Sequence, residues 1–152
     1  MTVLPIDAVR AAVVDHFKAN PFSVTVGDDE KAVTVCDFQP HSGVMPDTSL
    51  PAVYIYCDDE RVGVDGYEQR DHDIDLQIVM QTLTTRDDAA DQLAQIYAQV
   101  DALMASGGDF GGVVDGCNLK GSRLVRLQGE LTFHSRAVNY EINATSQAFA
   151  PE

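Results

Sequence analysis

Residues 67–83 read YEQRDHDIDLQIVMQTL, and this stretch decides the fold class. Its side chains alternate in character, with Ile74, Leu76, Ile78 and Met80 on one side and Asp73, Asp75, Gln77 and Val79 on the other. Because successive side chains of a strand point to opposite faces, this period of two predicts a long strand with one buried and one wet face. The preceding stretch LPAVYIYC, residues 50–57, predicts a second strand antiparallel to it, with a charged, glycine-containing reversal over residues 58–66.

A helix is expected on each side of this hairpin in the sequence. From Pro5 to Ala19 the apolar residues recur at helical spacing, at Ile6, Val9, Val13 and Phe17. After the hairpin, the hydroxyl of Thr84 or Thr85 can accept from the free N–H groups of a second helix. The apolar stripe of that helix consists of Ala89, Leu93, Ile96, Val100 and Leu103, and Gly107 and Gly108 end it.

The flanking segments give weaker signals. Residues 22–26 and 32–38 are β-prone around an acidic turn at 27–30, and residues 39–47 predict a long loop. The glycine-rich stretch up to Gly121 leaves room for at most one short strand.

Two further strands are expected at the C-terminal end, over residues 123–128 and 131–142. They turn at Gly129 or, as an alternative, at residues 134–136, and residues 145–152 predict a flexible tail. The sum is an α+β fold, a mostly antiparallel sheet packed by two main helices, in a single domain spanning residues 1–144.

Composition excludes several classes of protein. The chain has 152 residues and a formal net charge of −14, the wrong sign for binding nucleic acid through its phosphates. It contains neither a membrane-spanning apolar run nor a recognisable secretory signal, so we expect a cytoplasmic, soluble product. The three cysteines lack metal-ligand spacing, and Cys36 and Cys57, each in an apolar, β-prone stretch, are expected to be small buried hydrophobes.

The densest polar cluster, residues 70–75, raises the possibility of a metal-dependent phosphohydrolase with His16 and His41 as distant ligands. In a strand, however, Asp71, Asp73 and Asp75 share one face while His72 lies on the other, so they do not converge on one ion. A solvated strand face explains the carboxylates. We therefore expect no metal, no cofactor and no enzymatic activity, and keep a small phosphohydrolase as the enzyme-class alternative.

The order of segments is more informative than any motif. It runs VRAAVVDHF (9–17), LPAVYIYC (50–57), HDIDLQIVMQTL (72–83), AADQLAQIYAQVDALMA (89–105), RLVRLQGEL (123–131) and AVNYEINA (137–144). Over residues 5–144 this series resembles the minor tail protein U family, the tail terminator proteins of long-tailed bacteriophages.

This resemblance implies a structural protein that forms a hexameric ring. Such a ring caps the tail tube, stops polymerisation of the tube protein and provides the surface to which the head joins. The implied partners are further copies of the chain, the major tail tube protein and the head–tail connector, with no nucleic-acid or membrane partner. The implied location is the head-proximal end of the virion tail, after assembly in the bacterial host cytoplasm. A connector or tail-completion protein of the neck is the alternative.

A closed ring needs two different surfaces that fit each other. Opposite charge suggests one pair of candidates, Arg70, Asp71, Asp73 and Asp75 against Arg123, Arg126 and Arg136 of a neighbour. Pairing within the chain is the alternative use of these charges. Exposed loops predict contacts with the tube or the connector through Asp58, Asp59, Glu60, Arg61, His41 and Asp47.

The net charge also bears on assembly. Copies that each carry −14 repel one another, so we expect added salt or Mg²⁺ to promote ring formation. An acidic bore would also repel DNA and let it slide.

Overall fold

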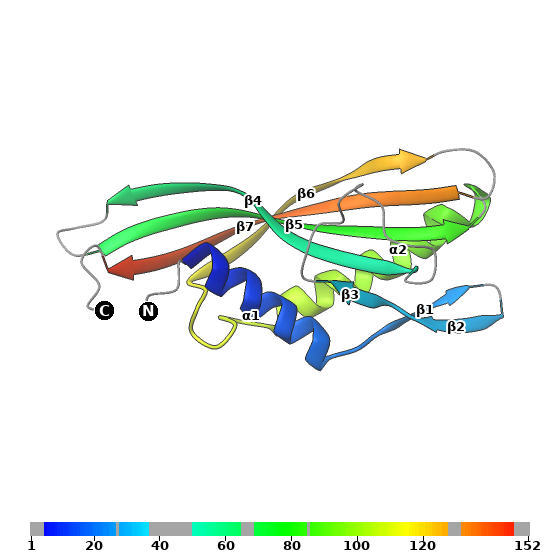
Figure 1. Cartoon of the computed structure of the whole chain (residues 1–152), viewed down its shortest axis with the longest axis horizontal. Coiled ribbons are helices and arrows are strands. Elements are labelled where there is room, and N and C mark those ends of the chain that lie inside the picture. Colours follow the sequence, from blue (N-terminus) through cyan, green and yellow to red (C-terminus); the bar gives the residue numbers. More distant parts are fainter. Residues whose placement is uncertain are drawn as a thin grey trace.

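The computed structural model describes residues 5–26, 28–36, 50–64, 69–84, 86–127 and 132–147. The elements, in chain order, are α1 (Pro5–Ala19), β1 (Ser23–Val26), β2 (Asp29–Ala32), β3 (Thr34–Cys36), β4 (Ala52–Val64), β5 (Gln69–Thr84), α2 (Arg86–Ser106), β6 (Gly116–Leu127) and β7 (Thr132–Gln147). Strands β1 and β2 form a small hairpin, and the other five form one sheet in the order β3-β4-β5-β7-β6. Its pairings are antiparallel except for β3 with β4, so the fold is α+β as predicted (Figure 1).

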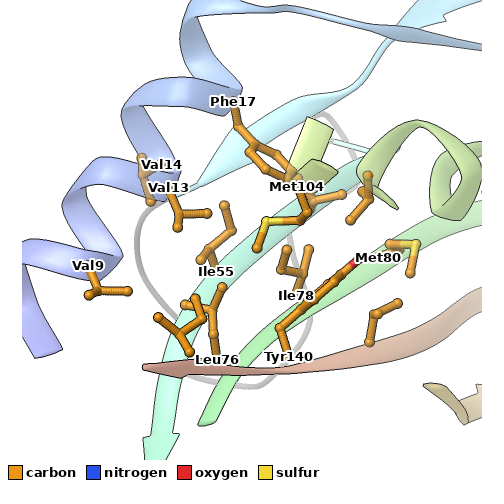
Figure 2. Packing of buried hydrophobic residues seen from close by; sticks show 14 of the residues in the cluster. Val9, Val13, Val14, Phe17, Ile55, Leu76, Ile78, Met80, Met104 and Tyr140 are labelled. Atoms are coloured by element: carbon orange, nitrogen blue, oxygen red, sulfur yellow. The ribbon is translucent and has the colours of Figure 1, made fainter. Parts of the chain in front are cut away.

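One apolar core joins both helices to a single face of the sheet. Its α1 contribution is Val9, Val13, Val14 and Phe17, and Figure 2 shows these side chains directed at Ile55, Leu76, Ile78 and Tyr140 of the sheet. Ala89, Leu93, Ile96 and Val100 of the predicted α2 stripe are buried, and Leu103 is half-buried. Burial of one such aliphatic side chain contributes roughly 1.5–3 kcal/mol. Because this face holds the larger of the two groups of buried apolar residues, it accounts for most of the stabilising burial.

The turn after α2 closes the core at one end. Gly107 N donates to Leu103 O at 3.0 Å, and Gly108 has a φ of 59°, a conformation that favours glycine. A Cβ atom at Gly107 would lie 2.4 Å from the ring of Phe110, which is buried in the core. From α1, His16 Nε2 lies 3.0 Å from Leu103 O, so a side chain of one helix serves a carbonyl at the end of the other.

Several expected strand boundaries are wrong. Residues 58–64 continue β4 instead of reversing, and β6 already begins at Gly116. Strand β7 extends to Gln147, past the strand end expected at 142 and into the tail expected from 145. In each case hydrogen bonds to a neighbouring long strand outweigh the low strand propensity of Asp, Gly and Asn.

Two turns expected from the sequence also differ. Residues 134–136 lie inside β7, which excludes the alternative turn there, and Asp29 and Glu30 belong to β2 instead of a turn. The loop expected over residues 39–47, the turn at Gly129 and the tail over residues 148–152 lie outside the described residues, as does Thr85; the side chain of Thr84, the other expected cap, is not described.

Candidate functional site

The sheet face that points away from both helices carries most of the residues singled out by the sequence. We call it the helix-free face, and it has two ends of different chemistry. Its charged end comprises Asp59 and Arg61 on β4, Asp71, Asp73 and Asp75 on β5, Glu141 and Asn143 on β7, and Lys120 on β6. Its apolar end comprises Cys36, Ala52, Tyr54, Val79 and Ala137.

A network of charged side chains crosses four strands at the charged end. Arg61 Nη1 lies 3.3 Å from Asp75 Oδ2, and its Nη2 lies 3.3 Å from Glu141 Oε2. The same arginine lies 3.6 Å from Asp59 Oδ2, while Lys120 Nζ lies 3.7 Å from Glu141 Oε2. The hydrogen bond to Asp75 is the main reason that the pKa of Arg61 is raised. The network thus begins with a carboxylate on β4 and ends with an ammonium group on β6.

The three aspartates predicted to share one strand face lie together, but Arg70, which was predicted to lie with them, does not. Asp71, Asp73 and Asp75 share the helix-free face, and Asn143 Nδ2 donates to Asp73 Oδ1 at 2.5 Å. Arg70 alternates with them along β5 and therefore points to the opposite face, so its inclusion in that acidic group is wrong.

The three arginines proposed as the basic counterpart do not form one surface. Arg123 lines the helix-free face, whereas Arg136 points to the helix-covered side and donates from Nη1 to Ser122 Oγ at 2.9 Å. The backbone of Arg126 pairs with Ser135, and its side chain lies outside the described atoms. Register separates Arg123 from Arg136, which linear spacing does not reveal.

The residues assigned to a contact loop are instead part of a strand. Asp58, Asp59, Glu60 and Arg61 lie in β4, where the register with β5 shifts between Cys57 and Asp59. This β-bulge absorbs one residue and lets the strand continue, so the acidic run becomes part of the sheet. His41 and Asp47 lie outside the described residues.

His72 occupies a buried position on the side opposite to Asp71 and Asp73, as alternation predicts. Its Nδ1 lies 3.0 Å from Glu60 Oε2 and its Nε2 lies 2.6 Å from Ser146 Oγ, so both ring nitrogens have partners within the chain. The described residues contain no group of three or more His, Cys, Asp or Glu side chains placed to hold a metal ion.

A shallow hollow of about 260 Å³ lies on the helix-free face beside β6. Its lining includes Gln77, Lys120, Arg123 and Asn139. The two charged side chains in this lining are cations, in a chain whose net charge is −14. The hollow is therefore suited to an anionic group such as a carboxylate.

At the apolar end, the side chains are withdrawn from solvent although both helices pack elsewhere. Val79 is 3 % exposed and Tyr54 is 5 % exposed, and the rings of Tyr54 and Tyr56 stack with centroids 5.9 Å apart. Burial raises the pKa of Tyr54 to about 12. The expected wet face of β5 is therefore wet only at its charged end.

The cysteines fit the role of small hydrophobes that the sequence suggests. Cys36 is buried, and Cys57 and Cys117 are half-buried. Burial raises the pKa of the Cys57 thiol to about 11 and also raises that of Cys117, so both are protonated at neutral pH.

Sequence reasoning missed two members of the charged network, Glu141 and Lys120. The alternation of Asn139, Glu141 and Asn143 with Tyr140 and Ile142 marked one polar strand face and was available as a signal for Glu141. Lys120 stands in a glycine-rich stretch without such alternation, and only the pairing of β6 with β7, in which Lys120 is a bulged residue, brings it to this face.

Comparison with known proteins finds no protein-family model that matches the chain, and no curated protein matches its sequence significantly. Among the described helices, none is both long and apolar enough to span a membrane.

Proposed function

We propose that this chain is a tail terminator of a long-tailed bacteriophage. In this role it forms a ring of about six copies that caps the tail tube, stops addition of tube subunits and offers the head-joining surface. The resemblance in segment order over residues 5–144 suggests the class, and the observed α+β fold is compatible with it.

The observation that carries the proposal is that the sheet has two open edges of different character. Strand β3 pairs only with Ala52, Val53 and Tyr54, so within the described residues β4 has no strand neighbour on that side from Ile55 to Val64. At the other edge, β6 has β7 as its single strand neighbour within the part of the chain that the structure describes. Two unlike edges of one sheet favour head-to-tail contacts, which close into a ring when the rotation between copies allows it.

The charges of the chain support a structural role in preference to catalysis. The charged residues of the helix-free face are engaged in pairs across strands instead of converging on a reaction centre. Net repulsion between copies remains, so assembly should strengthen when salt or Mg²⁺ screens it.

The first test is the solution mass, measured by light scattering on a sizing column with and without Mg²⁺ and over a range of protein concentrations. The expected species has about six times the chain mass of 16.5 kDa. A strict monomer in every condition, including the presence of preformed tail tubes, would contradict the proposal.

The second test separates a terminator from the related neck proteins. Added to polymerising tail tube protein, the ring should bind tube ends in electron micrographs and shorten the tubes as its concentration rises. A ring that binds the head connector and leaves tube length unchanged would instead identify a connector or tail-completion protein.

A further inference from the structure

The two open edges each carry a bulged residue of opposite charge. On β4 the register with β5 skips Asp58, between Cys57 and Asp59, and on β6 the register with β7 skips Lys120, between Leu119 and Gly121. A bulge leaves its extra residue without a ladder partner, so these two residues stand at the edges without completing a pair. Both side chains reach the helix-free face, where Asp58 Oδ2 accepts from Gln77 Nε2 at 3.1 Å and Lys120 pairs with Glu141.

The two bulges also lie almost level across the sheet. Residues that pair across the four strands form rows. One row consists of Tyr56, Gln77, Asn139 and Gly121, and the second row after it consists of Asp59, Asp75, Glu141 and Asn118. Asp58 and Lys120 both fall between these two rows. They differ by at most one residue step along the strands, about 3.3 Å.

Strand direction allows the sheet to continue from one copy to the next. Because the pairs β4–β5, β5–β7 and β7–β6 are all antiparallel, β4 and β6 run in opposite directions. A second copy in the same orientation, placed beside the first, therefore sets its β4 antiparallel to β6. Its helices then lie on the same side, and the two helix-free faces join.

We infer that a second copy docks its β4 edge on the β6 edge, with Asp58 and Asp59 of one copy against Lys120 and Arg123 of the next. Charge complementarity carries the inference, because the network within each chain begins with Asp59 on one edge and ends with Lys120 on the other. The hollow beside β6, lined by Lys120 and Arg123, receives a carboxylate of the neighbour.

This contact rests on the proposed function, which requires two unlike surfaces that fit each other, and it specifies which surfaces they are. It relies on side chains more than on continuous backbone pairing, because the bulges on both edges interrupt the ladder. Protection of the edges against aggregation is the competing use of the same bulges and of Lys120. Salt screens the net repulsion between copies over long distances and acts less on a contact pair shielded from water.

Carbodiimide cross-linking tests the contact directly, because this reagent joins a carboxylate to an amine without a spacer. The full chain, as an equal mixture of unlabelled and ¹⁵N-labelled protein, is cross-linked and its peptides are analysed by mass spectrometry. About half of the links from Lys120 to Asp58 or Asp59 should join one light and one heavy peptide, because neighbouring copies pair at random in an equal mixture. The link from Lys120 to Glu141 within a chain should join peptides of equal label and serves as the internal control.

Charge reversal tests the energetic role of the contact. Lys120→Glu should reduce self-association at least tenfold, and so should the double variant Asp58→Lys with Asp59→Lys. A mixture of these two variants should restore association, because each then meets an edge of opposite charge. Lys18→Glu is the matched control, since it makes the same change of charge at an exposed position on α1 and should leave association within about twofold of the unmodified chain.

The possible results distinguish this contact from the proposed function. If the unmodified chain forms rings without mixed-label links from Lys120, and Lys120→Glu forms rings equally well, the edge contact is overturned while the ring remains. If the unmodified chain is monomeric but the mixture of reversed variants associates, the contact is supported and a ring in solution is not. If neither associates, both are overturned.

Discussion

The two ends of the helix-free face follow the same alternation of side chains along β5 and yet differ in chemistry. Around Val79 the neighbouring strands supply Tyr54 and Ala137, and these side chains are almost fully withdrawn from solvent. Around Asp75 they supply Asp59, which is exposed, and Glu141, which is half-buried, and both lie close to Arg61. Alternation therefore assigns a residue to a face, but cross-strand neighbours decide whether that part of the face is buried.

Of the substitutions considered, Val79→Asp at the apolar end should lower the stability of the fold most. The new carboxylate would be placed among Tyr54 and Ala137, at a position where Val79 is only 3 % exposed. We expect a loss of about 3 kcal/mol or more in the free energy of unfolding, measured by urea denaturation. Val79→Ala controls for lost volume and should cost less; equal stability of Val79→Asp and the unmodified chain would show that the apolar end is wet.

Gly107→Ala provides a reference on the helix-covered face. The added Cβ would lie 2.4 Å from the Phe110 ring, so the ring must move within the core. The expected loss is about 1–3 kcal/mol in urea unfolding. Gly63→Ala is a suitable control, because a Cβ there meets no atom within 4 Å. A similar effect of both substitutions would indicate that the Phe110 contact does not hold the turn.

The pH dependence of stability gives the next largest effect. Of the two ends of the helix-free face, only the apolar end has a tyrosine with a strongly raised pKa. Burial raises the folded-state pKa of Tyr54 from 10.0 to about 12. Since the folded state binds this proton more tightly, the contribution is fully present below pH 10 and is lost as the pH rises from 10 to about 12. One group changes stability by at most about 1.4 kcal/mol per pH unit.

Tyr54→Phe should therefore make stability fall less steeply over that range than in the unmodified chain, as urea titrations at several pH values would measure. The pKa of Tyr140, on the helix-covered face, is raised by burial and by its hydrogen bond to Asp101, so part of the alkaline loss persists. An unchanged slope in Tyr54→Phe would mean that the phenol is solvated.

The smallest effect is expected at the charged end. Asp75→Asn removes one partner of Arg61 in a solvent-exposed network, where Glu141 and Asp59 remain to pair with the guanidinium. The stability loss should be less than about a third of that of Val79→Asp and should shrink further as salt is added. A large loss that does not respond to salt would show that the network holds the fold together.

The sequence predicted the elements whose patterns are local and strong. Helix α1 matches its expected bounds of 5 and 19, and four of the five residues in the expected α2 stripe are buried. The buried side of β5, from Ile74 to Met80, is also as predicted. In each case a period of 3.6 or of two residues repeats often enough to specify which side faces the core.

Predictions failed where a residue's role depends on a distant partner. The sequence predicted a turn over residues 58–61 because acidic residues disfavour strands. In the structure, the β-bulge after Cys57 and the pairing with the sixteen-residue strand β5 keep these residues in the sheet. Arg123 and Arg136 were grouped as one basic surface, and register then placed them on opposite faces of the sheet. Val79 was assigned to the wet side because the sequence does not reveal that Tyr54 and Ala137 are its neighbours.

What the sequence by itself determined is the α+β class, the two helices, the first long hairpin and the strongly acidic balance, since all of these follow from composition and short-range periodicity. Only the tertiary structure decided the strand order, which leaves β4 and β6 at open edges, and the register, which sets Asp58 and Lys120 almost level on them. The physical reason is that strand pairing joins residues far apart in the chain, through backbone hydrogen bonds that no local pattern records.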